Sequence, residues 1–320
     1  MRPTVPLLDR LLDASVLFSY DASGFRRHAR RFVPGEADTP LGGGLYVVTG
    51  ANRGLGRALA AALAARGATV ALLCRDAAAG AAAAAAMGPG RAVCLPLDLT
   101  DRAAIAAAPA ALAAAAPGLP LRGLVHNAAV LPTAPLRTAD GRDGVIATHL
   151  DGPLRLTAAL WPALRAADDA RIVWISSGGA LTQRLDPAAL VPARFDGVQA
   201  YARTKRAQIV LARLLQARAG GPRLRVYAMH PGWADTPGVQ TSLPRFHALL
   251  GRRLRSAEEG ADTALWLLAR RPAADPGFYL DRAPAAEHPL PGTAARPADE
   301  AALWTRCLAE AGLPEGAFDG

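Results

Sequence analysis

The segment Tyr-Ala-Arg-Thr-Lys at residues 201–205 carries the side chains best suited to chemistry in this sequence. Tyr201 and Lys205 are four residues apart, which places them on one face of a helix. A free phenol has a pKa of about 10 and is a poor base at neutral pH, but a nearby ammonium favours the phenolate. The pair can then exchange a proton with a substrate carbonyl or hydroxyl while a hydride moves to or from nicotinamide.

Lys205 is the only lysine among the 36 basic residues of the chain. The heavy use of alanine, glycine, proline and arginine indicates a GC-rich coding bias, which would have placed an arginine wherever arginine serves. A compact ammonium can polarise the phenol and donate to a ribose, whereas a guanidinium is always charged and has another shape. We therefore predict that Lys205 is catalytic. The alternative is a solvated lysine beside an unrelated buried tyrosine.

A serine completes this candidate catalytic set. The segment "RIVWISSGG" reads as a buried strand that ends in two serines, and Ser177 stands 24 residues before Tyr201. A serine hydroxyl at the end of that strand can hydrogen-bond the same substrate oxygen as the phenol. We predict that Ser177, Tyr201 and Lys205 act together on a carbonyl/alcohol pair.

A glycine-rich turn follows the first expected strand, in the segment "VVTGANRGLGRALA". Glycines let the backbone turn sharply and approach a pyrophosphate, and the helix that follows presents free N–H groups to it. A strand before the turn and a helix after it supply the context that this motif requires. The turn therefore predicts a dinucleotide site that contains Gly50, Asn52, Arg53, Gly54, Leu55 and Gly56.

The residues after the second strand bear on which dinucleotide binds. An acidic residue there would favour NAD, but Cys74 and Arg75 stand in its place. Arg75 and Arg53 suit a 2′-phosphate, because guanidinium matches phosphate through its planar fork. We predict NADP(H), and Asp76 keeps NAD(H) as the alternative.

Two further strand ends carry polar or small residues. Asp98 and Leu99 follow the third strand, and Asn127 and Ala128 follow the fourth. Ligands of open α/β sheets lie at the carboxyl ends of the strands, so we expect these residues to border the cofactor.

Strand-like and helical segments alternate from Leu41 onwards. The alternation predicts a Rossmann-type α/β fold, a doubly wound parallel sheet of about seven strands with helices on both faces. The expected strands are 45–49, 69–74, 92–95, 121–126, 171–176, 224–229 and 278–280, and the expected helices are 55–66, 77–87, 103–116, 144–166, 201–219 and 257–269. We expect an N-terminal helical extension over 1–40, the NADP-binding catalytic domain over 41–283, and a tail over 284–320 with a short helix near 301–311.

These motifs together resemble the short-chain dehydrogenase/reductase family in its NADP-preferring form. The stretches "SSGGALTQRLD", "FDGVQAYARTKRAQIVL", "MHPGWADTPGV" and "SGFRRHARRFVP" resemble more specifically its family member 12 subgroup. The resemblance implies that Tyr201 is the general acid/base, that Lys205 lowers its pKa and holds the ribose, and that Ser177 orients the carbonyl. It also implies that Pro231, Gly232 and Thr236 border the nicotinamide carboxamide.

The chain departs from the family pattern at two positions. Ala129 stands where the family has a glycine, and His149 aligns with an asparagine that is thought to hold a water in a proton relay. A histidine can hold a water and carry a proton, so His149 is a candidate catalytic residue. The alternative is a packed or solvated histidine that leaves a slow enzyme.

The expected substrate is a small lipophilic carbonyl or alcohol. Four apolar residues in the loops beyond the strand ends are candidates to line its pocket, or else simply pack those loops: Leu181, Phe195, Trp233 and Phe246. The second function that we consider is an NADP-binding regulatory or scaffold protein with weakened catalysis.

Composition bounds the partners and the location. The formal charge is +9, but the arginines are scattered and aromatic content is 5%, so we expect no nucleic-acid groove. Three cysteines without metal spacing fit a reducing cytoplasm, and no apolar run approaches the ~20 residues of a membrane span.

The family resemblance implies a homodimer that pairs through the helices 144–166 and 201–219. Apolar residues at helical spacing over 7–16 predict a helix packed on the domain, or alternatively one that lies on a membrane surface.

Overall fold

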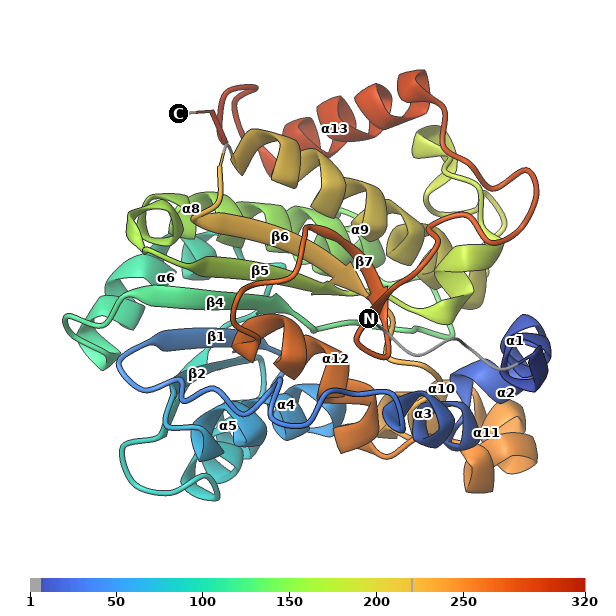
Figure 1. Ribbon diagram of the computed structural model, residues 1–320. Coiled ribbons are helices and arrows are strands. Elements are labelled where there is room, and N and C mark those ends of the chain that lie inside the picture. The colour runs from blue at the N-terminus through green and yellow to red at the C-terminus, as the bar shows by residue number, and fades with distance from the viewer. Residues whose placement is uncertain (1–6, 220, 320) are drawn as a thin grey trace.

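The computed structural model describes residues 7–219 and 221–319. Its centre is an eight-stranded sheet in the order β3-β2-β1-β4-β5-β6-β7-β8 (Figure 1). The strands are β1 Leu45–Thr49, β2 Thr69–Cys74, β3 Ala92–Pro96, β4 Leu121–His126, β5 Ala170–Ile175, β6 Leu224–Met229, β7 Gly277–Leu280 and β8 Ala283–Pro284. The order reverses between β1 and β4, which is the switch point of a doubly wound sheet.

The predicted doubly wound fold is confirmed. All seven expected strands are present within one residue of their predicted bounds, and they run parallel. The eighth strand is a two-residue segment that pairs antiparallel with β7. Such a short strand has no hydrophobic period, so it could not be predicted from the sequence.

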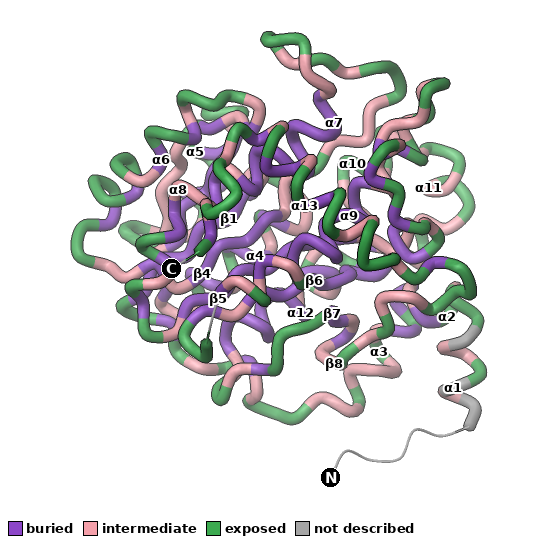
Figure 2. The backbone as a smooth tube through the Cα atoms, turned by 90° about the horizontal axis from the view of Figure 1, so that it is seen from above, coloured by how far each residue is buried: buried purple, intermediate pink, exposed green. Residues whose placement is uncertain are grey.

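Helices cover both faces of the sheet and enclose two separate cores (Figure 1). Successive strand residues point to opposite faces, so Val47 packs into one core and Val48 into the other. One face carries α4 Gly54–Ala65, α5 Ala77–Ala85 and α12 Ala257–Ala269. The other face carries α6 Arg102–Ala115, α8 Gly152–Ala166 and α9 Gly197–Ala219. Figure 2 shows the buried residues gathered along the strands and the inner sides of these helices.

The helix expected over 144–166 is divided. It consists of α7 Gly144–Ile146, a π-helical turn Ala147–Asp151, and α8. Pro153 at the start of α8 has no N–H to continue the regular hydrogen-bond ladder, which explains a break at this point. Gly152 has no room for a side chain, because a methyl group there would lie 2.2 Å from the carbonyl oxygen of Leu99. The π turn therefore places His149 against the strand ends.

The N-terminal part forms three short helices: α1 Leu7–Ala14, α2 Leu17–Tyr20 and α3 Ala22–Ala29. Val16 has a left-handed backbone (φ 57°), which separates α1 from α2. The predicted packed apolar face does not hold for Leu11 and Val16, whose exposed fractions are 63% and 43%. The side chains of Leu7 and Leu8, which belong to the same prediction, lie outside the described residues.

The C-terminal segment forms α13 Pro297–Ala311, which lies over α8 and α9 (Figure 1). Trp304 and Phe318 are buried there, and the Phe318 ring makes an edge contact with Trp161 of α8. The Arg218 guanidinium of α9 lies over the Trp304 ring, with its central carbon 3.8 Å from the ring centroid. The face through which a dimer was expected to pair is therefore partly covered by the chain's own helix.

Candidate active site

The turn between β1 and α4 is shaped so that only glycine fits at several positions. Gly50 and Gly54 have positive φ values of 64° and 53°. A methyl group at Gly50 would lie 2.9 Å from the Cα atom of Ala128, and one at Gly56 would lie 2.4 Å from Nδ2 of Asn127. The loop is thus pressed against the residues after β4, and α4 begins at Gly54 with its N–H groups at the strand ends.

Asn127 holds this turn in place. Its side-chain Nδ2 donates to the carbonyl oxygens of Thr49 at 2.8 Å and of Gly50 at 3.1 Å. The hydroxyl of Thr49 accepts the backbone N–H groups of Asn127 and Ala128, at 3.0 and 3.1 Å. Asn127 therefore fixes the backbone that shapes the site. Thr49 shares this task, which the sequence did not reveal because a threonine at a strand end has many uses.

The arginines predicted to read a 2′-phosphate lie on the surface beside this turn. Arg53 precedes α4 and Arg75 follows β2; both are exposed, and neither side chain has a hydrogen-bond or ion-pair partner within residues 7–219 and 221–319. Asp76 is used differently, because its carboxylate accepts the N–H of Ala79 at 2.9 Å and caps α5. The carboxylate of Asp98 likewise accepts from Thr100, through the backbone N–H at 2.8 Å and the hydroxyl at 2.9 Å.

Leu99 does not present its side chain to a ligand. It is 7% exposed and packs into the core under α6 and α8. Its place beside Asp98 at the strand end is as expected, but its contact with a cofactor would have to come from the backbone.

Tyr201, Ser177 and Lys205 come together at the carboxyl end of β5. Ser177 follows the strand and begins a short 3₁₀ turn, Gly178–Thr182, where its oxygen accepts the N–H of Gly179 at 3.4 Å. Burial raises the pKa of Tyr201 above its usual value, and a hydrogen bond with Ser177 only partly opposes this shift. The phenol is therefore protonated at neutral pH.

Lys205 lies beneath this pair and is 2% exposed. Its Nζ donates to the carbonyl oxygen of Ile175 at 2.7 Å and lies 5.6 Å from the centroid of the Tyr201 ring. Burial lowers the pKa of Lys205 to about 7. The expectation that an ammonium lowers the pKa of Tyr201 is thus not met in this geometry, since burial disfavours the charged form of both groups.

His149 has both ring nitrogens engaged by the protein. Nε2 accepts the backbone N–H of Val130 at 2.9 Å, so the proton is on Nδ1, which donates to the Thr204 hydroxyl at 2.7 Å. Burial, helped by the nearby charge of Lys205, holds the pKa of His149 well below 6.5. The ring is therefore neutral and meets the Tyr201 ring edge-on at 5.6 Å. These contacts favour the packed histidine over one that holds a water.

The segment after β6 lies over the glycine turn. A methyl group at Gly54 would lie 3.5 Å from Thr236, which caps α10 Pro237–Ser242. Gly232, which follows Pro231, has φ 72°, and a methyl group there would lie 2.2 Å from Nε of Arg255. The structure thus brings this predicted segment to the same edge of the sheet as the other site residues.

The four apolar candidates for the pocket divide into two kinds. Leu181 is buried in the core, so it packs its loop instead of lining a site. Trp233, Phe246 and Phe195 are half-buried, and the Trp233 and Phe246 rings meet edge-on at 5.4 Å. Phe246 belongs to α11 Pro244–Leu250, which follows α10 in the segment expected to form a lid.

An open parallel sheet with a glycine turn after its first strand defines a protein of the Rossmann class. The comparisons with known proteins then narrow this class. The profile of the family described as short chain dehydrogenase matches residues 45–245. The chain therefore belongs to the short-chain dehydrogenase/reductase family, whose members are oxidoreductases that bind nicotinamide cofactors.

Several members of this family are similar over most of their length. The chain is 40% identical over 299 residues to dehydrogenase/reductase SDR family member 12 of Bos taurus, covering 91% of this chain and 93% of that protein. It is 31% identical to human retinol dehydrogenase 12, covering 74% and 77% of the two chains. The Pseudomonas aeruginosa RhlG/NADP active-site complex superposes with a TM-score of 0.63 at 26% identity, covering 76% and 95%.

Neither a membrane-spanning helix nor a cluster of metal ligands is found in the part of the chain that the structure describes. No described helix is both long and apolar enough to cross a membrane. Within residues 7–219 and 221–319, no group of three or more histidine, cysteine or acidic side chains could hold a metal ion.

Proposed function

We propose that this chain transfers hydride between NADPH and a lipophilic aldehyde or ketone, or runs the reverse alcohol oxidation. The observation that carries this proposal is the meeting of Tyr201, Ser177 and Lys205 at the carboxyl end of β5, where Nζ of Lys205 donates to the carbonyl oxygen of Ile175 and lies 5.6 Å from the centroid of the Tyr201 ring. The glycine turn lies along the same edge of the sheet. Proton-transfer groups and a dinucleotide-shaped backbone are thus side by side.

The residues present fit a nicotinamide dinucleotide. The glycine turn, the free N–H groups of α4 and the segment at Gly232 and Thr236 would hold it, and when bound it would supply or accept the hydride. The preference for NADP(H) is supported by Arg53 and Arg75, which have no partner among the described residues, and by the use of Asp76 as a helix cap. RhlG, a structural neighbour, was solved with NADP. NAD(H) is the alternative.

Tyr201 would act at the substrate oxygen. Because its pKa is raised, its resting form is the neutral phenol, which suits donation of a proton to a developing alkoxide. This protonation state favours carbonyl reduction at neutral pH. Ser177 would hold the same oxygen in place, and Lys205 would return a proton towards Tyr201 after each turnover, since its pKa of about 7 lets the amine both carry and release one.

His149 would act as a positioning residue. Its ring links the backbone after β4 to Thr204 of α9, one turn of helix from Tyr201. This bridge fixes how far the phenol stands from the strand ends.

A lipophilic substrate is supported by the half-buried aromatic side chains Trp233 and Phe246 beyond the strand ends. The name of one relative, retinol dehydrogenase 12, refers to a lipophilic alcohol. Neither observation selects a particular compound, so the substrate is proposed only as a class.

The proposal is tested by NADPH consumption with purified protein against a panel of apolar aldehydes and ketones. Turnover should occur on at least one of them, and Tyr201→Phe should abolish it without changing the Kd for NADPH. The Phe variant keeps the ring packing, so a loss of turnover isolates the hydroxyl. Turnover that survives in Tyr201→Phe would refute the assignment.

One observation favours the second candidate, a cofactor-binding regulatory or scaffold protein. Both nitrogens of His149 are occupied by protein groups, so its side chain offers no place for a relay water. The same assay separates the two functions, because the scaffold proposal expects tight NADPH binding with no turnover on any carbonyl.

The assembly and the location stay predictions. The covering of α8 and α9 by α13 argues against the pairing face that the family resemblance implied, so we expect any homodimer to use another surface. Light scattering on the full chain tests this expectation. A cytoplasmic location and the division at residues 40 and 283 remain as predicted from the sequence.

A further inference from the structure

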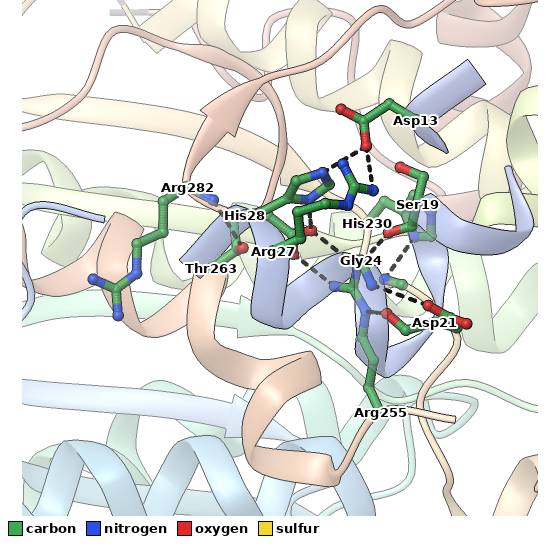
Figure 3. Close-up of polar contacts among 12 residues, drawn as sticks. Asp13, Ser19, Asp21, Gly24, Arg27, His28, His230, Arg255, Thr263 and Arg282 are labelled. Atoms are coloured by element: carbon green, nitrogen blue, oxygen red, sulfur yellow. Dashed lines mark hydrogen bonds and ion pairs between the residues drawn. The ribbon is translucent and has the colours of Figure 1, made fainter. Parts of the chain in front are cut away.

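A buried arginine fastens the N-terminal helices to the domain (Figure 3). Arg255 is 1% exposed; its Nη2 donates to the carbonyl oxygen of Ser19 at 2.8 Å, and its Nε donates to that of Asp21 at 3.2 Å. The same guanidinium donates to both carboxylate oxygens of Asp281, at 2.6 and 2.9 Å. A buried charge needs all of these partners, so the end of α2 is held in one position.

The carboxylate that completes this contact lies on a strained turn. Asp281 and Arg282 follow β7 with positive φ values of 48° and 57°, a conformation that is strained for non-glycine residues. Asp281 also bonds Nδ1 of His28 at 2.6 Å, which ties α3 to the same turn. Burial raises the pKa of Asp281, but the hydrogen bond with His28 and the charge of Arg255 outweigh it and hold the pKa below its usual value. The Asp281 carboxylate that binds Arg255 is therefore ionised at neutral pH.

This fastening places Tyr20, the last residue of α2, beside the catalytic serine. The carbonyl oxygen of Tyr20 accepts the N–H of Trp233 at 2.7 Å, and the two rings meet edge-on at 5.9 Å. A methyl group at Gly178 would lie 3.4 Å from Cδ2 of Tyr20. Gly178 directly follows Ser177, so this half-buried aromatic ring from the N-terminal helices lies against the residue next to the predicted catalytic serine.

A buried histidine fixes the orientation of the Tyr20 ring. His230 is fully buried, and its Nδ1 accepts the N–H of Gly232 at 3.0 Å, so the proton is on Nε2. Nε2 has no hydrogen-bond partner among the described residues. The His230 and Tyr20 rings are nearly perpendicular with centroids 4.3 Å apart, which is the geometry of an edge-to-face contact.

We propose that Tyr20 is a specificity-determining residue and forms one wall of the substrate site. This inference rests on the proposed function. With Trp233 and Phe246, the Tyr20 ring makes a row of aromatic side chains in edge contact, and the Tyr20 end of this row lies against Gly178, the residue after Ser177. Flat aromatic faces favour a flat, apolar carbonyl compound, such as an aryl or fused-ring aldehyde, over a short aliphatic one. The N-terminal helices are thus part of the active site.

The test compares two aldehydes of different size, 2-naphthaldehyde and butanal, with NADPH as reductant. Tyr20→Ala should lower the ratio of kcat/KM for 2-naphthaldehyde to that for butanal at least tenfold, mainly through KM, and leave the Kd for NADPH unchanged. Tyr20→Leu keeps bulk without a flat face and should give a smaller shift in the same direction. Phe18→Ala is the matched control, because Phe18 lies on the same short helix but is 37% exposed and stacks on Arg253.

A second readout separates this inference from the proposed function. Calorimetric binding of 2-naphthaldehyde is measured with NADP⁺ present, so that no hydride is available. If the wild type binds the aldehyde but does not reduce it, and Tyr20→Ala weakens binding tenfold, the inference stands while the proposed function fails. If the wild type turns over both aldehydes and neither Tyr20 variant changes their ratio, the inference fails while the function stands. Equal losses on both aldehydes, or no binding of 2-naphthaldehyde at all, would also overturn it.

Discussion

Replacing Lys205 with methionine removes a buried amine whose pKa the structure lowers from 10.5 to about 7. The folded state disfavours the charged form, so the unfolded chain binds more protons between these two values. Stability contributed by this group is therefore lowest below pH 7 and rises as the pH increases towards 10.5. Integrating over that shift from pH 6 to pH 9 gives a gain of about 2–3 kcal/mol, at about 1.36 kcal/mol per unit.

The assay is urea unfolding of the wild type and Lys205→Met at several pH values between 6 and 9. Groups that titrate alike in both proteins cancel in the difference. His126 and His149, whose pKa values the charge of Lys205 helps to lower, stay neutral in the wild type throughout this range. The difference in unfolding free energy between wild type and variant should rise by about 2–3 kcal/mol across the range.

A direct titration is also possible because Lys205 is the only lysine of the chain. Protein labelled with ε-¹³C-lysine, without a lysine-containing tag, gives one lysine signal by NMR. Its midpoint should lie near pH 7, and near 10.5 after unfolding. Parallel stability curves together with a folded midpoint near 10 would refute the reasoning, because the amine would then be charged at neutral pH despite its burial.

Substitutions at three positions test the remaining assignments. Arg75→Asp should lower the NADPH/NADH affinity ratio at least tenfold, whereas Arg223→Asp, an exposed arginine at the amino end of β6, should not; an unchanged ratio for the first would remove the 2′-phosphate assignment. Lys205→Arg should reduce kcat at least 100-fold despite keeping the charge, because guanidinium neither releases its proton nor fits the bond to the Ile175 oxygen; near-normal turnover contradicts this account. His149→Ala should destabilise the fold by about 1–3 kcal/mol in urea unfolding, since it leaves a backbone N–H unpaired, while His149→Asn should keep activity and the pH profile of kcat; a shifted profile would show that the histidine carries a proton.

The sheet could be predicted closely because its strands are buried on both faces. Segments such as Leu45–Thr49 and Leu224–Met229 are nearly continuous apolar runs bounded by turns, and such runs are typical of buried parallel strands. The interruption at Ala147–Asp151 was not predicted, because the sequence analysis expects one helix over the helical segments on either side of it. Pro153 was a local signal for a break here, whereas the close contact of Gly152 with Leu99 is tertiary and could not be predicted from the sequence.

The candidate site was predictable where spacing alone fixes geometry. Tyr201 and Lys205 share a helix face because they are four residues apart, and three glycines between a strand and a helix predict a tight turn. What the sequence could not reveal is the electrostatic balance. The amine was expected to lower the pKa of the phenol, but burial depends on the whole fold and raises one pKa while it lowers the other.

The N-terminal helices show why part of a site can escape sequence reasoning altogether. Their apolar spacing predicts a packed face, yet the contacts that position them are polar and long-range: Asp21 meets Arg253 and Arg255, and His28 meets Asp281, more than 200 residues away. Arginines are so frequent in this chain that Arg255 carries no signal of its own. Its role follows only from its burial, because a guanidinium withdrawn from water must be satisfied by the segment it holds. The same reasoning makes the position of Tyr20 a property of the catalytic domain, so we expect a change at Asp281 to alter substrate binding through Arg255.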